Sequence, residues 1–439
     1  IKGDIKDFDA VYNFGKLVDA LTIEIENVNI EALQKLEEEG VQIFPKPAVL
    51  RTIKNKILQK QYYEQHNIPT ASFVITQNKE ELKGKESFLP AVHKLAEGGY
   101  DGRGVQLMHD AGQMEMGFDA PSVLEKMIPI KKEIAQMVAV DANGNMALYP
   151  PVEMVFDATL NLLDYQLCPA GISEGVLQKV QSIAKDVVRH FDSPGLFAVE
   201  MLIDAEDTVW VNETAPRVHN SGHHTIEAHY SSQFDMLWRI LLQYPLGNTA
   251  ALYPSVMVNV IGADGFSGNV RYEGLSKILE NKNAFVHLYG KAQTKPGRKM
   301  GHITYVGTEL TQLVDQAHQA KDVLKVVSWN TFYPSRLPFI SPNTLIKVNE
   351  CYNISFKKSA RLYLSIFAPK LPYNQVKIFK ASGIFALCIV VFSIVACNSK
   401  RKEDAAAQQR SGPRPPAQVT GYIVQTDVVA ESVEVSGTL

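Results

Sequence analysis

The order of apolar and polar positions predicts alternating helices and strands over most of the chain. Up to about Trp329 the helical and strand-like patterns alternate, as they do in α/β and α+β domains. An amphipathic helix is expected over residues 47–66, with Pro47 in its first turn. A strand over residues 72–76 is expected to follow it.

Two neighbouring strand-like runs carry acidic residues. The run 196–203 places Glu200 among apolar residues, and the run 209–211 leads into Asn212 and Glu213. A lone carboxylate in so apolar a strand is costly to bury unless it is paired or binds a metal. Each run alone fits a hairpin with surface acids. The two runs together, with the loop that follows them, favour a metal site.

The loop after the second run is rich in groups that bind anions. It contains Arg217, His219, Asn220, His223 and His224. A guanidinium beside a metal carboxylate is suited to hold a carboxylate-like or phosphate-like anion through its planar fork. The loop therefore predicts an anion site next to the metal.

A glycine-rich segment lies between two predicted strands. The first strand carries Lys94, and GGYDGRG follows at 98–104. Glycines let a backbone approach phosphates closely, and a nearby lysine can meet their charge. The spacing fits neither a P-loop nor a Rossmann fingerprint, because a strand rather than a helix follows. A glycine-rich hairpin alone is weak evidence, but Tyr100, Asp101 and Arg103 within it make the segment more specific.

Two further charged segments fit more than one interpretation. Glu125 to Ile128 end one predicted strand and Glu133 begins the next, so this segment could cross an adenine and reach its ribose. On its own it fits an ordinary charged loop. Lys54, Lys56 and Lys60, on the polar side of the 47–66 helix, fit a solvated face.

In their order along the chain these pieces resemble an ATP-grasp enzyme. GGYDGRG at 98–104, EKMI at 125–128 and NETAPRVHNSGHH at 212–224 closely resemble the 5-(carboxyamino)imidazole ribonucleotide synthase (PurK) family of purine biosynthesis. TIEIENV at 22–28 and KPGRKMGHI at 295–303 match the same family. The resemblance covers roughly residues 1–329. It implies an ATP-grasp fold with the remnant of a Rossmann-like preATP-grasp domain and a small C-terminal domain.

The resemblance also implies ATP and Mg²⁺ as cofactors and gives roles to individual residues. The magnesium ligands would be Glu200 and Glu213. The ATP side would be formed by Lys56, Lys94, Gly99, Tyr100, Asp101, Gly102, Arg103, Gly104, Val105, Glu125, Lys126, Met127, Ile128, Glu133, Asn212 and Glu213. The substrate side would be formed by Tyr100, Asp101, Arg103, Arg217, His219 and Asn220, with Lys295 and Arg298 on the ribonucleotide phosphate.

The implied reaction is the carboxylation of aminoimidazole ribonucleotide by bicarbonate through carboxyphosphate, by a cytoplasmic homodimer. Three departures from the family pattern stand out. The opening strand and glycine-rich turn are missing, a usual nucleotide-contacting His falls near Phe156, and the usual Gln-Asp reads Lys54-Asn55, which leaves Lys56 as the aligned basic residue. The alternatives are another ATP-grasp carboxylase or ligase, an inactive remnant, and a lipid-anchored efflux adaptor.

Composition agrees with an ordinary soluble protein. The 439 residues are 46% hydrophobic and 21% charged with a net charge of −3, so charge gives no case for a nucleic-acid partner. The cysteines Cys168, Cys351, Cys388 and Cys397 show no metal-binding spacing, and Cys168 is interpreted as a reduced core or loop thiol. Since the first residue is Ile1, we expect the chain to start inside a longer protein.

After Trp329 the pattern changes. We expect an irregular linker at 330–377, an apolar segment at 378–397 that resembles a lipoprotein signal, and a tail at 398–439 that resembles the start of an efflux-pump adaptor. Membrane association is expected only through 381–397, and a concatenation of two coding regions is favoured over a genuine fusion. The domains before this tail are expected at 1–45 (preATP-grasp), 46–245 (ATP-grasp) and 246–329 (C-terminal).

Overall fold

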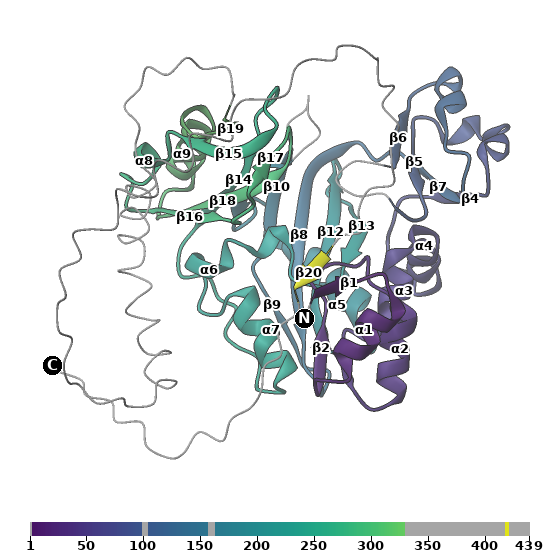
Figure 1. The fold of residues 1–439 in the computed structure, drawn as a ribbon. Helices are drawn as coiled ribbons and strands as arrows, with labels where there is room; N and C mark the ends of the chain where they lie inside the picture. Colours follow the sequence, from purple (N-terminus) through teal and green to yellow (C-terminus); the bar gives the residue numbers. More distant parts are fainter. Residues whose placement is uncertain (1, 99–103, 157–162, 330–417, 421–439) are drawn as a thin grey trace, which may run out of the picture. The chain divides into compact units, whose positions relative to one another are not determined.

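The computed structural model describes residues 2–98, 104–156, 163–329 and 418–420 (Figure 1). Two compact units are present, one formed by residues 1–329 with 415–439 and the other by 330–414. The second unit lies outside the described residues, as do the predicted linker and the apolar segment 381–397. Among the described residues no helix is long and apolar enough to cross a membrane.

The N-terminal part is a small layer of helices and short strands, coloured purple in Figure 1. Strands β2 and β3 pair in parallel, and β1 pairs antiparallel with β20, so Gly3 lies opposite Val419. Asp7 and Asn29 cap the two helices through their side chains. The elements are β1 (Lys2–Asp4), α1 (Phe8–Gly15), β2 (Ala20–Thr22), α2 (Ile30–Glu38), β3 (Gln42–Phe44) and β20 (Gln418–Thr420).

The helix predicted over 47–66 is two helices, so the prediction of one continuous helix is wrong. α3 (Pro47–Lys54) ends at Asn55, whose extended backbone (φ −107°, ψ 113°) breaks the helix. The Asn55 side chain then accepts hydrogen bonds from the amides of Ile57 and Leu58 and caps α4 (Lys56–Gln65). Asparagine favours such a cap over a helix interior because its side chain competes for backbone groups.

A small antiparallel sheet follows, in the order β4-β7-β5-β6. Its inner face packs on a core of Leu82, Ala91, Met108, Met114 and Leu124. The expected strand at 72–76 is β4 (Phe73–Thr76), and the other members are β5 (Ala91–Leu95), β6 (Val105–Met108) and β7 (Ser122–Lys126). Three short 3₁₀ helices cover this sheet: η1 (Lys79–Leu82), η2 (Glu86–Phe88) and η3 (Ala111–Met116).

A nine-stranded sheet dominates the part of the chain that the structure describes, and its order is β13-β12-β8-β10-β11-β14-β18-β16 with β9 on β8. Figure 1 shows β8, β12 and β13 side by side as long strands. The strands are β8 (Ile130–Val140), β9 (Met146–Leu148), β10 (Val152–Phe156), β11 (Leu163–Cys168), β12 (Gly195–Asp204), β13 (Val209–Ala215), β14 (Ser255–Ile261), β16 (Ala284–Leu288) and β18 (Lys299–Val306). The predicted hairpin is therefore formed by β12 and β13.

Alternation along β12 decides which of its residues face the site. Val199, Met201 and Ile203 pack against Val180 and Val187 of α5 (Glu174–Arg189). Their neighbours in sequence, including Glu200, point to the opposite face of the sheet. Farther along, that face is covered by α7 (Gln233–Leu241), preceded by η4 (Asn220–Gly222) and α6 (Thr225–Ala228).

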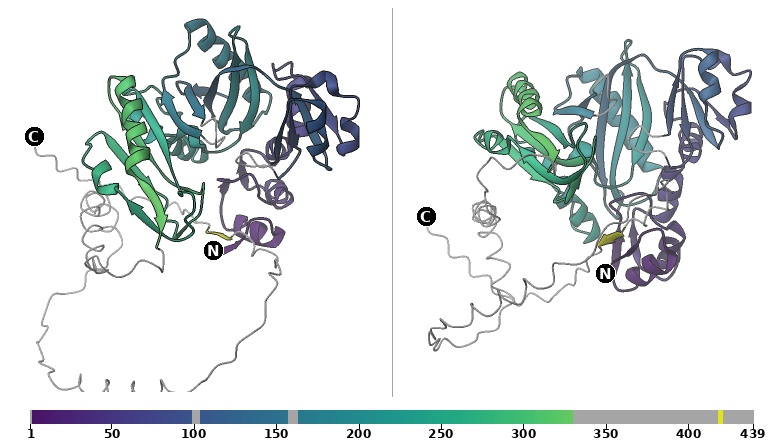
Figure 2. Two further views of the ribbon diagram at one scale, coloured as in Figure 1. Left: turned by 90° about the horizontal axis from the view of Figure 1, so that it is seen from above. Right: turned by 45° about the horizontal axis from the view of Figure 1, so that its top comes forward.

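The C-terminal part shares the large sheet and adds a smaller one. Strands β17 (Gln293–Thr294), β15 (Gly268–Glu273) and β19 (Lys325–Ser328) form the smaller sheet, with α8 (Leu275–Ile278) and α9 (Leu310–Val323) beside it. Figure 2 shows α9 (green) alongside these strands in both views. Leu313, Ala317 and Ala320 of α9 pack on β14 and β18 residues in one core.

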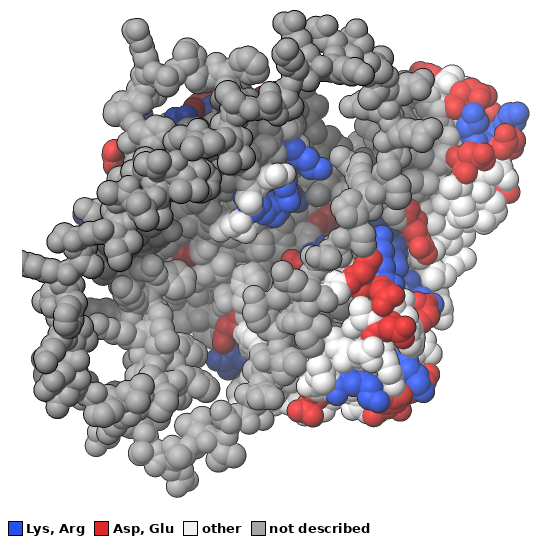
Figure 3. All heavy atoms as spheres, viewed as in Figure 1, with Lys and Arg blue, Asp and Glu red and all other residues white. Residues whose placement is uncertain are grey.

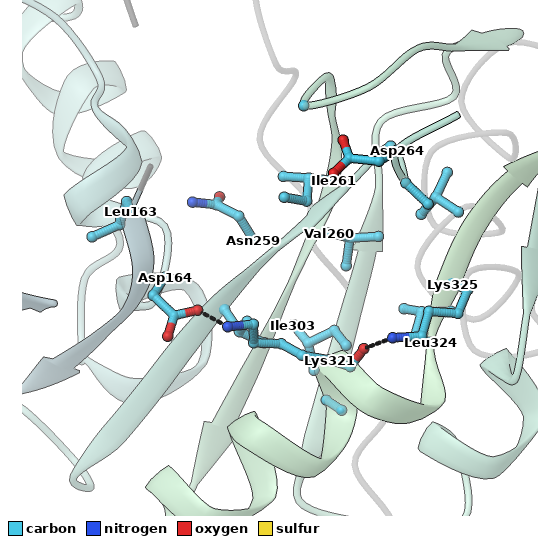
Figure 4. A pocket seen from close by; sticks show the side chains of 16 residues that line it. Leu163, Asp164, Asn259, Val260, Ile261, Asp264, Ile303, Lys321, Leu324 and Lys325 are labelled. Carbon is cyan, nitrogen blue, oxygen red and sulfur yellow. Dashed lines mark hydrogen bonds and ion pairs between the residues drawn. The ribbon is translucent and has the colours of Figure 1, made fainter. Parts of the chain in front are cut away.

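A cavity of about 260 Å³ lies beside α9 (Figure 4). Residues 258–264 of β14 and its following turn form one wall, and Lys321, which pairs with Asp164, lies opposite. None of the residues predicted for the ATP and substrate sites lines this cavity.

Charges on the visible surface are mixed in sign. Figure 3 shows lysines and arginines interspersed with acidic side chains on the part formed by the N-terminal helices. Lys35 pairs with Glu38 and Glu39 there, and Arg51 pairs with Glu31.

Candidate active site

Two carboxylates face each other across paired strands. Glu200 of β12 lies opposite Glu213 of β13, and a register shift follows Glu200. Burial raises the pKa of Glu200, and the charge of Glu213 raises it further, whereas the charge of Lys56 lowers the pKa of Glu213. Oxygen donors crowded in this way on two adjacent strands fit a hard divalent cation such as Mg²⁺.

The register of β8 brings a third carboxylate to the same face. Glu133 lies opposite Leu202, two residues along β12 from Glu200. Burial raises the pKa of Glu133 to about 7, and the charge of Lys94 only partly opposes this. Glu133 in turn raises the pKa of Glu200. The predicted ribose residue and the predicted metal ligand therefore belong to one electrostatic cluster.

Two of the predicted phosphate-binding lysines reach residues 212 and 213, which lie within β13. Lys56 Nζ lies 3.0 Å from Glu213 Oε2, and Lys94 Nζ donates to Asn212 Oδ1 at 2.9 Å. The Asn55 cap starts α4 at Lys56, whose own amide donates to the Ala96 carbonyl. The helix break thus places Lys56 next to the acids, and the structure brings together four residues that the sequence scatters over more than one hundred and fifty positions.

Glu125 forms a buried ion-pair triad. Its two oxygens lie 2.9 Å from Lys60 Nζ and 3.2 Å from Lys94 Nζ, and the Lys60 and Glu125 side chains are 3% and 5% exposed. The solvated face expected for Lys60 is therefore wrong. Burial lowers the pKa of Lys60 to about 8. Burial would raise the pKa of Glu125, but the charges of Lys94 and Lys60 together hold it below its usual value.

The backbone after Glu125 is partly engaged within the protein. The amides of Lys126 and Met127 donate to the carbonyls of Ser72 and Pro90 at 2.8 and 2.9 Å. The expectation that this segment offers its backbone to an adenine therefore does not extend to those two amides.

The loop after β13 contacts the N-terminal part of the chain through Arg217, and it contacts Glu200 through His219. Arg217 Nε donates to Glu26 Oε1 at 2.8 Å, and this pair is about three-quarters buried on both sides. His219 Nε2 lies 3.4 Å from Glu200 Oε1, while burial lowers the pKa of His219 to about 3. Gln233 fixes the loop because its amide accepts from the His219 amide and donates to the His219 carbonyl. Asn220 begins η4 and is half-buried.

The 295–303 segment contributes a residue that the sequence reasoning missed. Lys295 is exposed, and Arg298 donates to the Gln293 carbonyl at 2.8 Å. Lys299, the first residue of β18, acts electrostatically on Glu200 and His219 by lowering the pKa of each. Its position directly after the predicted Arg298 was the available signal.

A column of stacked imidazoles was also missed. His302 stacks on His223 and His287 with ring centroids 4.8 and 4.5 Å away, and His287 Nε2 lies 2.6 Å from Glu227 Oε1. Burial lowers the pKa of His223 to about 4 and of His302 to about 2. No spacing in the sequence links positions 223 and 302.

The glycine-rich loop is described only at its edges. Gly98 and Gly104 have φ values of 81° and 77°, which other residues rarely adopt. Val105 opens β6. The predicted residues Gly99, Tyr100, Asp101, Gly102 and Arg103 lie outside the described residues, and so does 157–162, which follows Phe156.

Family comparisons match three consecutive stretches. Residues 1–54 match the ribonucleotide synthetase preATP-grasp domain, 61–234 the ATP-grasp domain, and 255–316 the phosphoribosylaminoimidazole carboxylase C-terminal domain. ATP-grasp enzymes bind ATP with Mg²⁺.

Curated relatives match this chain over most of its length. An N5-carboxyaminoimidazole ribonucleotide synthase of Synechococcus elongatus is 33% identical over 322 residues, covering 71% of this chain and 80% of that protein. A phosphoribosylaminoimidazole carboxylase of Ogataea methanolica is 33% identical over 363 residues, and this chain spans 66% of its length.

Solved structures agree with the fold. N5-carboxyaminoimidazole ribonucleotide synthetase from Thermotoga maritima has a TM-score of 0.68 at 35% identity, covering 74% of this chain and 86% of that one. The Aspergillus clavatus synthase in complex with ADP and 5-aminoimidazole ribonucleotide has a TM-score of 0.66 at 31% identity, covering 73% and 85%.

Proposed function

Because the chain belongs to the N5-carboxyaminoimidazole ribonucleotide synthase family, we propose that it carboxylates 5-aminoimidazole ribonucleotide at the expense of ATP. Bicarbonate oxygen attacks the γ-phosphorus of ATP, giving carboxyphosphate and ADP. The exocyclic amine of the ribonucleotide then takes the carboxyl carbon, loses a proton, and phosphate leaves. The product is 5-(carboxyamino)imidazole ribonucleotide.

On the metal side, Glu200 and Glu213 would hold Mg²⁺. The bound ion would neutralise charge on the β- and γ-phosphates during transfer. The facing carboxylates of β12 and β13 support this role, since a cation would relieve the repulsion that raises the pKa of Glu200.

On the nucleotide side, Lys56 and Lys94 would exchange part of their present pairing for phosphate oxygens. Lys94 would keep its position through Asn212 and Glu125, which fix its ammonium from two sides. Residues 99–105 would cover the phosphates, and Lys126 to Ile128 with Glu133 would seat the adenosine. Glu125 would act as a positioning residue for the lysines.

On the substrate side, Arg217 would bind bicarbonate or carboxyphosphate, with Glu26 fixing the plane of its guanidinium through Nε. Arg217 Nη1 donates to the Val218 carbonyl, so Nη2 is the nitrogen that would meet a second anion. His219, Asn220, Tyr100, Asp101 and Arg103 would face the imidazole, and Lys295 and Arg298 would meet the ribonucleotide phosphate.

We also propose that the enzyme is a cytoplasmic homodimer whose domains are bounded at 1–45, 46–245 and 246–329. The family matches at 1–54, 61–234 and 255–316 support bounds near these positions. Light scattering of the purified chain measures its mass in solution, and a monomer would remove the dimer from the proposal.

The observation that carries the proposed function is the placement of Lys56 and Glu200 on either side of Glu213. Glu213→Gln keeps the shape of the side chain but removes the charge that would hold the metal. We expect at least a hundredfold lower release of ADP in the presence of bicarbonate and aminoimidazole ribonucleotide. Glu206→Gln, an exposed residue in the turn between the same strands, is the matched control and should leave turnover unchanged.

Two results would contradict the proposal. Near-normal turnover of Glu213→Gln at saturating Mg²⁺ would remove the metal role. ADP release by the unaltered chain that depends on bicarbonate but does not respond to the ribonucleotide would point instead to another ATP-grasp carboxylase.

A further inference from the structure

A cysteine and two histidines outside the proposed catalytic groups gather beneath the 216–224 loop. Cys168 is the last residue of β11, His224 precedes α6, and His229 follows it. One donor atom from each lies within 4.8 Å of the other two. The three residues are 1%, 2% and 4% exposed.

Several polar atoms of this cluster have no hydrogen-bond partner among the described residues. They are His224 Nε2, both ring nitrogens of His229, and the hydroxyl of Tyr149, whose ring lies 5.6 Å from that of His229. Buried polar atoms are nearly always paired, and an unpaired group calls for an explanation such as a missing ion. Two unpaired imidazoles in an apolar core would be costly to bury, so a bound ion is the better explanation.

The donor set and its surroundings suit one class of ion. A thiolate and two neutral imidazoles are ligands that zinc prefers, and a hydroxyl or water completes its tetrahedron. Donor atoms of such a tetrahedron lie roughly 3.5 Å apart, so small side-chain rotations would close the present spacing. The His224 ring is oriented from the far side by a hydrogen bond to the Ser221 backbone, which also accepts from Gln166 Nε2 at 2.9 Å. A ring N–H that donates there from Nδ1 leaves Nε2 unprotonated and available to a cation.

We propose that Cys168, His224 and His229 bind one zinc-like divalent cation, with water or the Tyr149 hydroxyl as fourth ligand. Binding exchanges the thiol proton of Cys168 for the cation and releases that proton to solvent. The ion would tie strand β11 to both ends of α6. It would thereby anchor the loop that carries Arg217 and His219, so its role is structural.

Cobalt is the probe for this site, because a cobalt–thiolate bond gives a charge-transfer absorption that oxygen and nitrogen ligands do not give. The full chain should carry serine at Cys351, Cys388 and Cys397, which leaves Cys168 as its one thiol. We expect one Co²⁺ per chain with the thiolate band, and displacement of Co²⁺ by one equivalent of Zn²⁺.

Variants in the same background test the ligands one by one. Cys168→Ser should lose the band, and His229→Gln should weaken Co²⁺ binding at least tenfold. His318→Gln, an exposed histidine of α9, should bind as the parent does. Circular dichroism confirms that each variant is folded, and His229→Gln carries the test if Cys168→Ser is not.

A second readout separates a structural ion from loose surface binding. Zn²⁺ should raise the melting temperature of the parent and leave that of His229→Gln unchanged, because an ion that binds the native state stabilises it. Cobalt binding without a thiolate band, or with equal affinity in parent and His229→Gln, would overturn the proposal. The cluster would then be a reduced thiol among neutral core histidines.

Discussion

The triad of Lys60, Glu125 and Lys94 leads to a prediction about stability. Glu125→Gln removes the one negative charge between two ammonium groups whose side chains are 3% and 15% exposed. Breaking a buried ion pair by removing one partner typically costs about 3–5 kcal/mol, because the remaining charge stays buried without compensation.

A change in the protonation of Lys60 relieves part of the buried charge. Burial already lowers the pKa of Lys60 to about 8 while Glu125 is present. Without Glu125 the lysine can lose its proton, and because its pKa in the parent is already near 8 this takes only about 1 kcal/mol at pH 7. The larger share of the cost is the loss of the ion pairs that Glu125 forms with Lys60 and Lys94. We therefore expect the free energy of unfolding to fall by about 3–5 kcal/mol.

The same reasoning gives a pH dependence with a definite sign. A lysine whose pKa is lower in the folded than in the unfolded state binds more protons when unfolded, so stability rises with pH between the two values. In the parent this window opens near pH 8, whereas in Glu125→Gln it opens at a lower pH, because the charge of Glu125 that raises the pKa of Lys60 is gone. The difference in stability should therefore shrink by up to about 1 kcal/mol between pH 7 and 8.

Thermal unfolding followed by circular dichroism measures both effects. At roughly 2–4 °C per kcal/mol, the melting temperature should fall by about 6–20 °C at pH 7. Glu115→Gln is the control, because Glu115 pairs with Lys79 at 3.6 Å with 73% of its side chain exposed, and surface pairs contribute little. A loss below about 1 kcal/mol in Glu125→Gln, or a difference that widens at higher pH, would refute the reasoning.

Two further changes test the small sheet and the loop. His93 is fully buried, and burial lowers its pKa to about 4. Its protonation should therefore reduce the free energy of unfolding progressively as pH falls from 6.5 towards 4, by up to about 3 kcal/mol. In urea titrations His93→Gln should lose less stability over this pH range, and parallel curves for parent and variant would contradict the prediction. At Gly222 an added Cβ would collide with Gln233 and Met137, so Gly222→Ala should displace the loop and lower ADP release at least tenfold, whereas Gly175→Ala, with open space around it, should not.

Local patterns predicted the strands of the site well. The apolar run at 196–203 and the β-branched run at 209–211 predicted β12 and β13, and the structure pairs them so that Glu200 lies opposite Glu213. Such strands are predictable because pairing between neighbours in sequence follows from periodicity and a short turn. The motifs added the family, which the fold comparisons confirm.

Contacts between distant positions were not predictable in the same way. The polar face of α4 was interpreted as solvated, but Lys60 is buried because β7 brings Glu125 to it from 65 positions away. Arg217 pairs with Glu26 across 191 positions. A single sequence carries no signal for such partners, since each residue alone has the pattern of a surface charge.

The helix break at Asn55 is a local feature, and it too was not predicted. Its capping role depends on a local competition between side chain and backbone, which apolar spacing over 47–66 does not reveal. The helix break it causes sends Lys56 to Glu213. Although Asn55 differs from the usual family residue, its cap still places Lys56 beside Glu213.

The pairing of β11 with β14 has a mechanical consequence for the reaction cycle. Tyr165 lies opposite Val258, so one ladder of main-chain hydrogen bonds continues from the strands of Glu200 and Glu213 to β18 and Lys299. Bending between neighbouring strands of the large sheet would break these hydrogen bonds. We therefore expect the large sheet to move as one rigid body, called the frame below. The sheet of β4 to β7 contacts this frame through side chains such as Lys94 on Asn212 and through the bridge at Thr70. We therefore expect the small sheet, rather than the large one, to move when nucleotide enters or leaves. Its amides should then exchange with deuterium faster than those of β8 and β12.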